Sequence, residues 1–245
     1  GIETGSEALL WELQTPPGLV VIGVITLISW LARRSIGFTV FTALGLLLIV
    51  NQGYWEETTE TLALVMASAL VCMGVGVPIG IAAARRPGLY KVLSPILDLM
   101  QTIPPFVYLI PALILFGLGM VPGLIATVIF AIPAPIRLTH LGITSTPPAL
   151  IEAGKAFGAT PLQLLVKVEL PFAAPQIMAG LTQTIMLSLS MVVIAALVGA
   201  DGLGVPTLRA LNTVNIAKGF EVGIAIVLVA IIFDRMFAKN GRRNG

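Results

Sequence analysis

The sequence has few of the residues that form disulfides or metal sites. Of its 245 residues, one is a cysteine, Cys72, and one is a histidine, His140. A single cysteine excludes an intrachain disulfide, and a zinc-type site needs several Cys or His ligands. Cys72 lies in an apolar run, where a free cysteine packs as a small hydrophobic residue. We therefore predict no metal site and interpret both residues as structural.

Charge is also scarce. Charged residues make up 11% of the chain and hydrophobic residues 57%, against about 25% and about 45–50% in soluble domains. The net charge is +2, and no basic run is interleaved with aromatic residues, which argues against a nucleic-acid partner. Uncharged windows cover residues 35–54, 61–84, 99–136 and 170–200. Because about 20 apolar residues cross the hydrocarbon core of a membrane, the sequence predicts an all-α, polytopic membrane helix bundle.

The apolar windows predict about seven transmembrane helices, over residues 17–32, 36–51, 59–84, 93–118, 121–139, 171–199 and 219–237. Lysine and arginine are enriched in cytoplasmic loops. With an outer N-terminus and a cytoplasmic C-terminus, twelve of the fourteen basic residues fall inside, and Arg209 and Lys218 stay outside. We therefore predict an outer N-terminus and a cytoplasmic C-terminus.

Three regions follow from this topology. Residues 1–57 form an outer segment with two accessory transmembrane helices. Residues 58–238 form a five-helix core, which contains the longest cytoplasmic loop, over residues 145–171. Residues 239–245 form a basic cytoplasmic tail.

Polar and proline residues interrupt several of the predicted spans. Irregular backbone at membrane depth is tolerated where protein or a water-filled path satisfies it, and an ionisable group in a span is a functional candidate. Asp98 also has the simpler interpretation of an acid that pairs with a nearby Arg or Lys. Our candidates for lining a translocation pathway are Asp98, Gln101, Thr102, Pro104, Pro105, Tyr108, Gln183, Ser188 and Ser190. Elsewhere, Gly74, Gly76 and Gly80 form a small-residue stripe that predicts close helix packing.

The loop of residues 145–171 has helix-boundary signals of its own. Thr146, followed by two prolines, resembles an N-cap, and Gly158 suits the position that ends a helix. Thr160 and Gln163 then have the spacing of a capping box. The loop therefore predicts a short helix, a sharp turn and a second helix.

The first of these short helices has an apolar face. Leu150, Ala153, Gly154 and Phe157 follow the i, i+3, i+4, i+7 spacing. Apolar surface exposed to the cytosol is typical of a docking element.

The same loop resembles the EAA loop of permeases of binding-protein-dependent ABC importers. It reads Glu152-Ala153-Gly154, three residues, Gly158, nine residues, and Val168-Glu169-Leu170-Pro171. The family pattern is Glu-Ala-Ala, three residues, Gly, nine residues, Ile, one residue, Leu-Pro. The spacing agrees throughout, and Gly154 and Val168 are mild departures. The resemblance implies a coupling helix that docks in a cleft of a cytoplasmic ATPase subunit, with Glu152, Ala153, Gly154, Phe157 and Gly158 as coupling positions.

Residues 97–108, 130–138 and 187–195 are similar to permeases of the glycine betaine/proline/choline class of type I ABC importers. That class takes up quaternary ammonium and related compatible solutes, including trimethylamine N-oxide, and serves osmoprotection. The resemblance implies a bacterial inner membrane and an assembly of two permease copies, two ATPase subunits and a solute-binding protein, which we expect to be a separate chain. Membrane lipid is the remaining partner.

The chain has no G-x-x-x-x-G-K-[ST] phosphate loop. We therefore expect no cofactor on this chain, and expect ATP and Mg to be used by the partner ATPase.

Three alternatives stay open. An importer of an amino acid or another small solute would share this architecture. An ion-coupled secondary transporter would need no docking loop. An intramembrane enzyme would need paired acids, a His cluster or an activated nucleophile in the spans, and we predict no catalytic residue.

Overall fold

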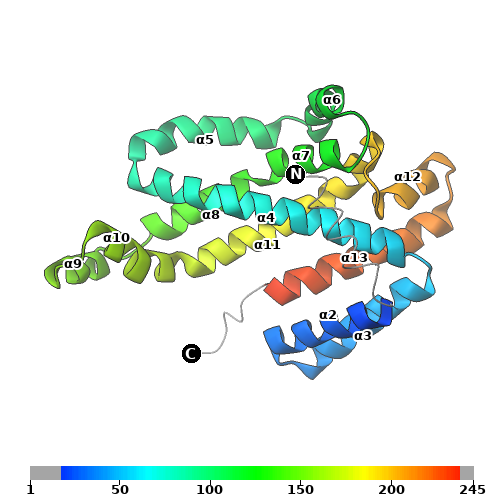
Figure 1. Cartoon of the computed structure of the whole chain (residues 1–245), viewed down its shortest axis with the longest axis horizontal. Coiled ribbons are helices and arrows are strands. Elements are labelled where there is room, and N and C mark those ends of the chain that lie inside the picture. Colours follow the sequence, from blue (N-terminus) through cyan, green and yellow to red (C-terminus); the bar gives the residue numbers. More distant parts are fainter. Residues whose placement is uncertain (1–17, 238–245) are drawn as a thin grey trace.

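The computed structural model describes residues 18–237, except the side chain of Leu19, and these residues are almost entirely helical (Figure 1). No β-strand occurs in that range, which confirms the predicted all-α class. The predicted outer segment of residues 1–17 and basic tail of residues 239–245 lie outside the described residues. The elements are α2 (Gly18–Arg33), α3 (Ile36–Asn51), α4 (Trp55–Arg85), α5 (Pro87–Thr102), α6 (Pro105–Phe116), α7 (Met120–Ala131), α8 (Pro133–Thr144), α9 (Pro148–Ala156), α10 (Pro161–Leu164), the π-helix η1 (Leu165–Glu169), α11 (Leu170–Ala195), the 3-10 helix η2 (Ala196–Val198), α12 (Gly204–Asn212) and α13 (Ile216–Phe237).

Four helical units in residues 18–237 are long and apolar enough to cross a membrane. They are α4, α7 with α8 (Met120–Thr144), the run from α10 to η2 (Pro161–Val198), and α13. Helices α5 and α6 would form a fifth, but a bend of 92° separates them. The prediction of one helix over residues 93–118 is therefore wrong.

Two other boundaries also differ from the prediction. The helix expected over residues 171–199 extends back through η1 and α10 to Pro161. Helix α12 was not predicted at all, and it lies at the end of the molecule opposite α9 and α10 (Figure 1). The Leu203 backbone N–H, just before α12, donates to Thr61 Oγ1 at 2.9 Å, which ties this end of the bundle to α4.

Helices α2 and α3 form an antiparallel hairpin beside α13 (Figure 1). Arg34, in the turn between them, has a positive φ of 47°. Both helices lie within a residue of their predicted ranges. They are 16 residues long, which is shorter than the roughly 20 residues of a straight span.

Helix α11 runs through the middle of the bundle and packs against α8, α7 and α4 (Figure 1). Helix α4 in turn packs closely on α8, because a Cβ at Gly76 would lie 2.8 Å from Pro135 Cγ, and one at Gly80 would lie 2.7 Å from the Ile136 carbonyl oxygen. Only glycine allows this approach. A Cβ at Gly74 would meet nothing within 4 Å, so the predicted stripe is confirmed for Gly76 and Gly80 and wrong for Gly74.

Candidate coupling loop and translocation face

The loop of residues 145–171 has the predicted helix, turn and second helix. Helix α9 ends at Ala156, and Gly158, just after the C-cap Phe157, has a φ of +75°, a conformation that glycine adopts without strain. The capping box that begins α10 is complete, with Gln163 N–H donating to Thr160 Oγ1 at 3.3 Å and Thr160 N–H donating to Gln163 Oε1 at 2.9 Å. Local signals in the sequence therefore determine the shape of this loop.

The predicted N-cap of α9 is wrong. The helix begins at Pro148 with Pro147 in the capping position, so Thr146 lies one residue too early for its side chain to cap the first turn. The Thr146 hydroxyl is buried and has no hydrogen-bond partner among the described residues.

Most of the predicted coupling residues of α9 point away from the bundle. Phe157 is 92% exposed and Leu150 is 45% exposed, while Glu152, Ala153 and Gly158 are also exposed. Gly154 is different. It is half-buried, and a Cβ there would lie 2.6 Å from Leu164 Cδ1, so this glycine lets α9 approach α10 instead of contributing to an exposed face.

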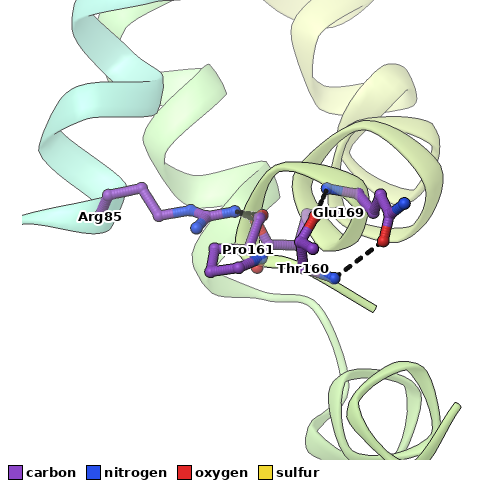
Figure 2. A network of polar contacts seen from close by, with 5 residues as sticks. Arg85, Thr160, Pro161 and Glu169 are labelled. Atoms are coloured by element: carbon purple, nitrogen blue, oxygen red, sulfur yellow. Dashed lines mark hydrogen bonds and ion pairs between the residues drawn. The ribbon is translucent and has the colours of Figure 1, made fainter. Parts of the chain in front are cut away.

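A charged contact holds the loop to the end of α4 (Figure 2). The guanidinium Nη2 of Arg85 donates to Glu169 Oε2 at 2.7 Å and to the Pro161 carbonyl oxygen at 3.2 Å. Glu169 is only 7% exposed. A buried carboxylate requires a charged or hydrogen-bonded partner, and Arg85 provides it.

The predicted pathway residues on α5 lie on an exposed face. Asp98 forms an ion pair with Arg137 of α8 at 2.5 Å, with side chains that are 60% and 32% exposed, so the simpler interpretation of Asp98 as a paired acid applies. Gln101 and Thr102 are exposed next to it, and α5 buries a single residue, Leu97. Polar groups inside a membrane need water or protein around them.

The bend between α5 and α6 has a clear cause. Pro104 and Pro105 have no backbone N–H, so the carbonyls one turn earlier lose their helical donors. The Tyr108 hydroxyl replaces one of them and donates to the Met100 carbonyl oxygen at 2.8 Å. Pro104, Pro105 and Tyr108 thus build the turn, and Tyr108 is half-buried in it.

The predicted pathway residues on α11 separate into two groups. Gln183 and Ser190 are exposed. Ser188 is fully buried, and its hydroxyl accepts a 2.9 Å hydrogen bond from the Ser68 hydroxyl of α4. Ser188 therefore joins two helices and does not line a surface of this chain, which contradicts its predicted role.

Helix α5 is held to α8 at a second point. The rings of Tyr90 and His140 stack with centroids 3.5 Å apart and an interplanar angle of 5°.

Among residues 18–237, no three His, Cys, Asp or Glu side chains gather as metal ligands would.

The geometry agrees with known transport proteins. Residues 76–244 match the family described as binding-protein-dependent transport system inner membrane component. The chain belongs to this family.

The permease is 48% identical over 241 residues to the glycine betaine transport system permease protein OpuAB of Bacillus subtilis, covering 96% of this chain and 85% of that protein. It is 46% identical over 241 residues to the glycine betaine/proline betaine transport system permease protein ProW of Escherichia coli, covering 98% and 67%. A chain of the MetNI methionine ABC transporter in an inward-facing conformation has 27% identity and a TM-score of 0.64 over 71% of this chain and 88% of that one. These matches confirm the predicted resemblance to permeases of the glycine betaine class. They also confirm that the chain is a transport subunit and not an enzyme.

The ion pair between Arg85 and Glu169 was missed from sequence, and the ion pair predicted for Asp98 had no named partner. Arg85 and Arg137 entered the prediction only as basic residues that set orientation. Their partners lie 84 and 39 residues away in the chain. The one available signal was an acid, Glu169, within the otherwise apolar end of the EAA pattern.

Proposed function

We propose that the permease moves a quaternary ammonium or related compatible solute across the bacterial cytoplasmic membrane, driven by ATP hydrolysis on separate subunits. The names of relatives that are 46–48% identical support this solute class. The methionine transporter is more distant, at 27% identity, so an amino acid is the less favoured cargo.

The exposed face of α9 carries the proposal of an ATPase partner. Phe157 is 92% exposed at the tip of a helix that projects from one end of the bundle (Figure 1). An apolar side chain in that position is covered when a protein docks on it. In this proposal Glu152, Ala153, Phe157 and Gly158 contact the ATPase, and Gly154 sets the height of α9 above α10.

The end that carries α9 is cytoplasmic in this proposal, and the α12 end faces outward toward a solute-binding protein. Arg85 and Arg86 end α4 beside the loop, and Lys155 lies on α9, in agreement with the enrichment of basic residues on the cytoplasmic side. The same orientation places the N-terminus outside and the C-terminus inside.

A second copy of the permease completes the pathway in this proposal. Asp98, Gln101 and Thr102 leave the polar face of α5 uncovered in one chain. Two such faces around a central space would give these groups the aqueous surroundings that they need. Gln183 and Ser190 of α11 stay as further lining candidates, while Pro104, Pro105 and Tyr108 shape the wall.

The transport cycle follows from these contacts. ATP and Mg bind to the partner ATPase, whose closure displaces α9 in each permease copy. The helix bundles then exchange between inward-open and outward-open arrangements, and the solute-loaded binding protein and ATP each favour one of them through different contacts in the two states.

The docking assignment is tested with two substitutions of the same residue type at opposite ends of the molecule. Phe157→Asp places a charge at the exposed C-cap of α9. Phe220→Asp does so near the start of α13, the helix that follows α12, where Phe220 is 71% exposed. We expect Phe157→Asp to abolish co-purification of the ATPase, and Phe220→Asp to retain it. Full co-purification with Phe157→Asp would remove α9 as the docking element.

The solute class is tested by uptake of labelled glycine betaine into proteoliposomes that hold the permease with its cognate ATPase and binding protein. Choline, proline, trimethylamine N-oxide and methionine serve as competitors, with and without hydrolysable ATP. ATP-dependent uptake, competed best by quaternary ammonium solutes, is the expected result. Uptake without ATP would contradict the importer mechanism, and competition by methionine alone would contradict the solute class.

A further inference from the structure

Helix α9 is attached to the rest of the permease by a narrow set of contacts. It packs against α10 and η1, and Gly154 lies so close to Leu164 that a Cβ would be 2.6 Å from Leu164 Cδ1. Leu164 is buried at the end of α10. A force that acts on α9 therefore enters the bundle through α10 and η1, and through residues 145–147, which join α9 to α8.

Arg85 fastens both ends of that short segment to α4 (Figure 2). Its Nη2 bonds to the Pro161 carbonyl oxygen at the start of α10 and to the Glu169 carboxylate at the end of η1. Among the charged side chains of residues 18–237, Glu169 is the one that is buried. Because a buried charge depends strongly on its partner, the end of α4 and this segment are held as one unit.

The segment between these two bonds has irregular helical geometry. η1 (Leu165–Glu169) is a π-helix directly between α10 and α11. Short π-helical stretches are rare and frequently occur at functional sites. The two bonds of Arg85 join α4 directly to both ends of this segment, in addition to the packing of α11 on α4.

We propose that Arg85 and Glu169 are a positioning pair that makes α4 move with the coupling loop, so that a displacement of α9 reaches the pathway helix α5. The proposal rests on the proposed function, in which an ATPase moves α9. The route continues from α4 through Gly80, which touches α8. It then passes through Arg137 of α8, which is paired with Asp98 on α5. Each step is a direct contact between neighbouring helices, which is the kind of network that carries coupling.

The test measures the coupling ratio, which is the amount of glycine betaine taken up per ATP hydrolysed, in the proteoliposome assay above. We expect Arg85→Gln to lower this ratio on the order of 2- to 30-fold, the range for a residue on a coupling route, while the ATPase still co-purifies. Arg86→Gln is the matched control, because Arg86 is adjacent, exposed and makes no ion pair among the described residues. Its ratio should equal that of the wild type.

Three further variants separate a pair from two independent effects. Arg85→Lys keeps the charge beside Glu169 and should restore part of the ratio. The double variant Arg85→Gln/Glu169→Gln should lose no more than the worse of the single variants Arg85→Gln and Glu169→Gln, because both changes remove one interaction.

Three results for the coupling ratio would overturn the proposal: a wild-type ratio in Arg85→Gln, an equal loss in Arg86→Gln, or additive losses in the double variant. Loss of ATPase co-purification in Arg85→Gln would also overturn it, because the pair would then support the fold of the docking loop. A wild-type complex without ATP-dependent uptake would refute the proposed function itself. The two failures are therefore distinct.

Discussion

Replacing Gly80 by alanine tests whether α4 and α8 are held as close together as the structure shows. A Cβ at this position would lie 2.7 Å from both the Ile136 carbonyl oxygen and the Thr139 Cβ. Neither atom is the free end of a flexible side chain, so the two helices must move apart. Gly74 lies on the same helix, and a Cβ there meets nothing within 4 Å. Gly74→Ala is therefore a matched control.

Two opposing effects set the size of the change. Alanine in place of glycine inside a helix favours folding by about 0.5–1 kcal/mol, and this gain applies at both positions. Overpacking costs about 1–3 kcal/mol, and it applies only at Gly80. We expect Gly80→Ala to lower the free energy of unfolding by up to roughly 2.5 kcal/mol, and Gly74→Ala to raise it by about 0.5–1 kcal/mol. With about 2–4 °C per kcal/mol for a chain of this length, Tm falls by up to roughly 10 °C in Gly80→Ala.

Thermal unfolding of the purified permease in one detergent, followed by loss of the monodisperse peak on size-exclusion chromatography, measures this difference. Both variants are heated in parallel with the wild type. Equal stability of Gly80→Ala and Gly74→Ala would refute the close contact between α4 and α8, and a loss in Gly74→Ala alone would reverse the assignment of the two faces.

Two further predictions concern polar contacts between helices. Tyr108→Phe leaves the Met100 carbonyl without its donor, so we expect a loss of about 1–3 kcal/mol in the free energy of unfolding. The same heating assay measures this loss, and Tyr90→Phe, which keeps its ring stack, is the control. Equal losses in both variants would contradict the role of the Tyr108 hydroxyl. Ser188→Ala removes the hydrogen bond from Ser68, so we expect a loss of about 0.6 kcal/mol in the free energy of unfolding and unchanged uptake of glycine betaine. A large fall in uptake at wild-type stability would restore Ser188 to the pathway.

The parts of the structure that follow from local sequence were predictable. Gly158 and the capping box of Thr160 and Gln163 determine backbone geometry within a few residues, and the structure has the turn that they predict. The one local error, at Thr146, arose because a second proline moved the start of α9 by a residue. Long apolar runs likewise marked the main helices.

The parts that depend on distant residues were not predictable from one sequence. The bond from Ser68 that buries Ser188 joins residues 120 positions apart. Pro104 and Pro105 indicated irregular backbone, but they do not by themselves give the 92° bend between α5 and α6. Helix α12 is short and mixed in polarity, and its position depends on the contact of Leu203 with Thr61.

The lengths of the helices have a consequence for the surrounding lipid. α2, α3 and α5 have 16 residues each, or about 24 Å, whereas the hydrocarbon core is about 30 Å thick. α4 has 31 residues, or about 46 Å. The α2–α3 hairpin is thus hydrophobically shorter than the membrane (Figure 1), and a bilayer that thins to match such a segment does so at a cost of fractions of a kcal/mol per Å. The stability of this fold therefore depends on the acyl-chain length of the lipid, just as the stability of a soluble protein depends on temperature or denaturant.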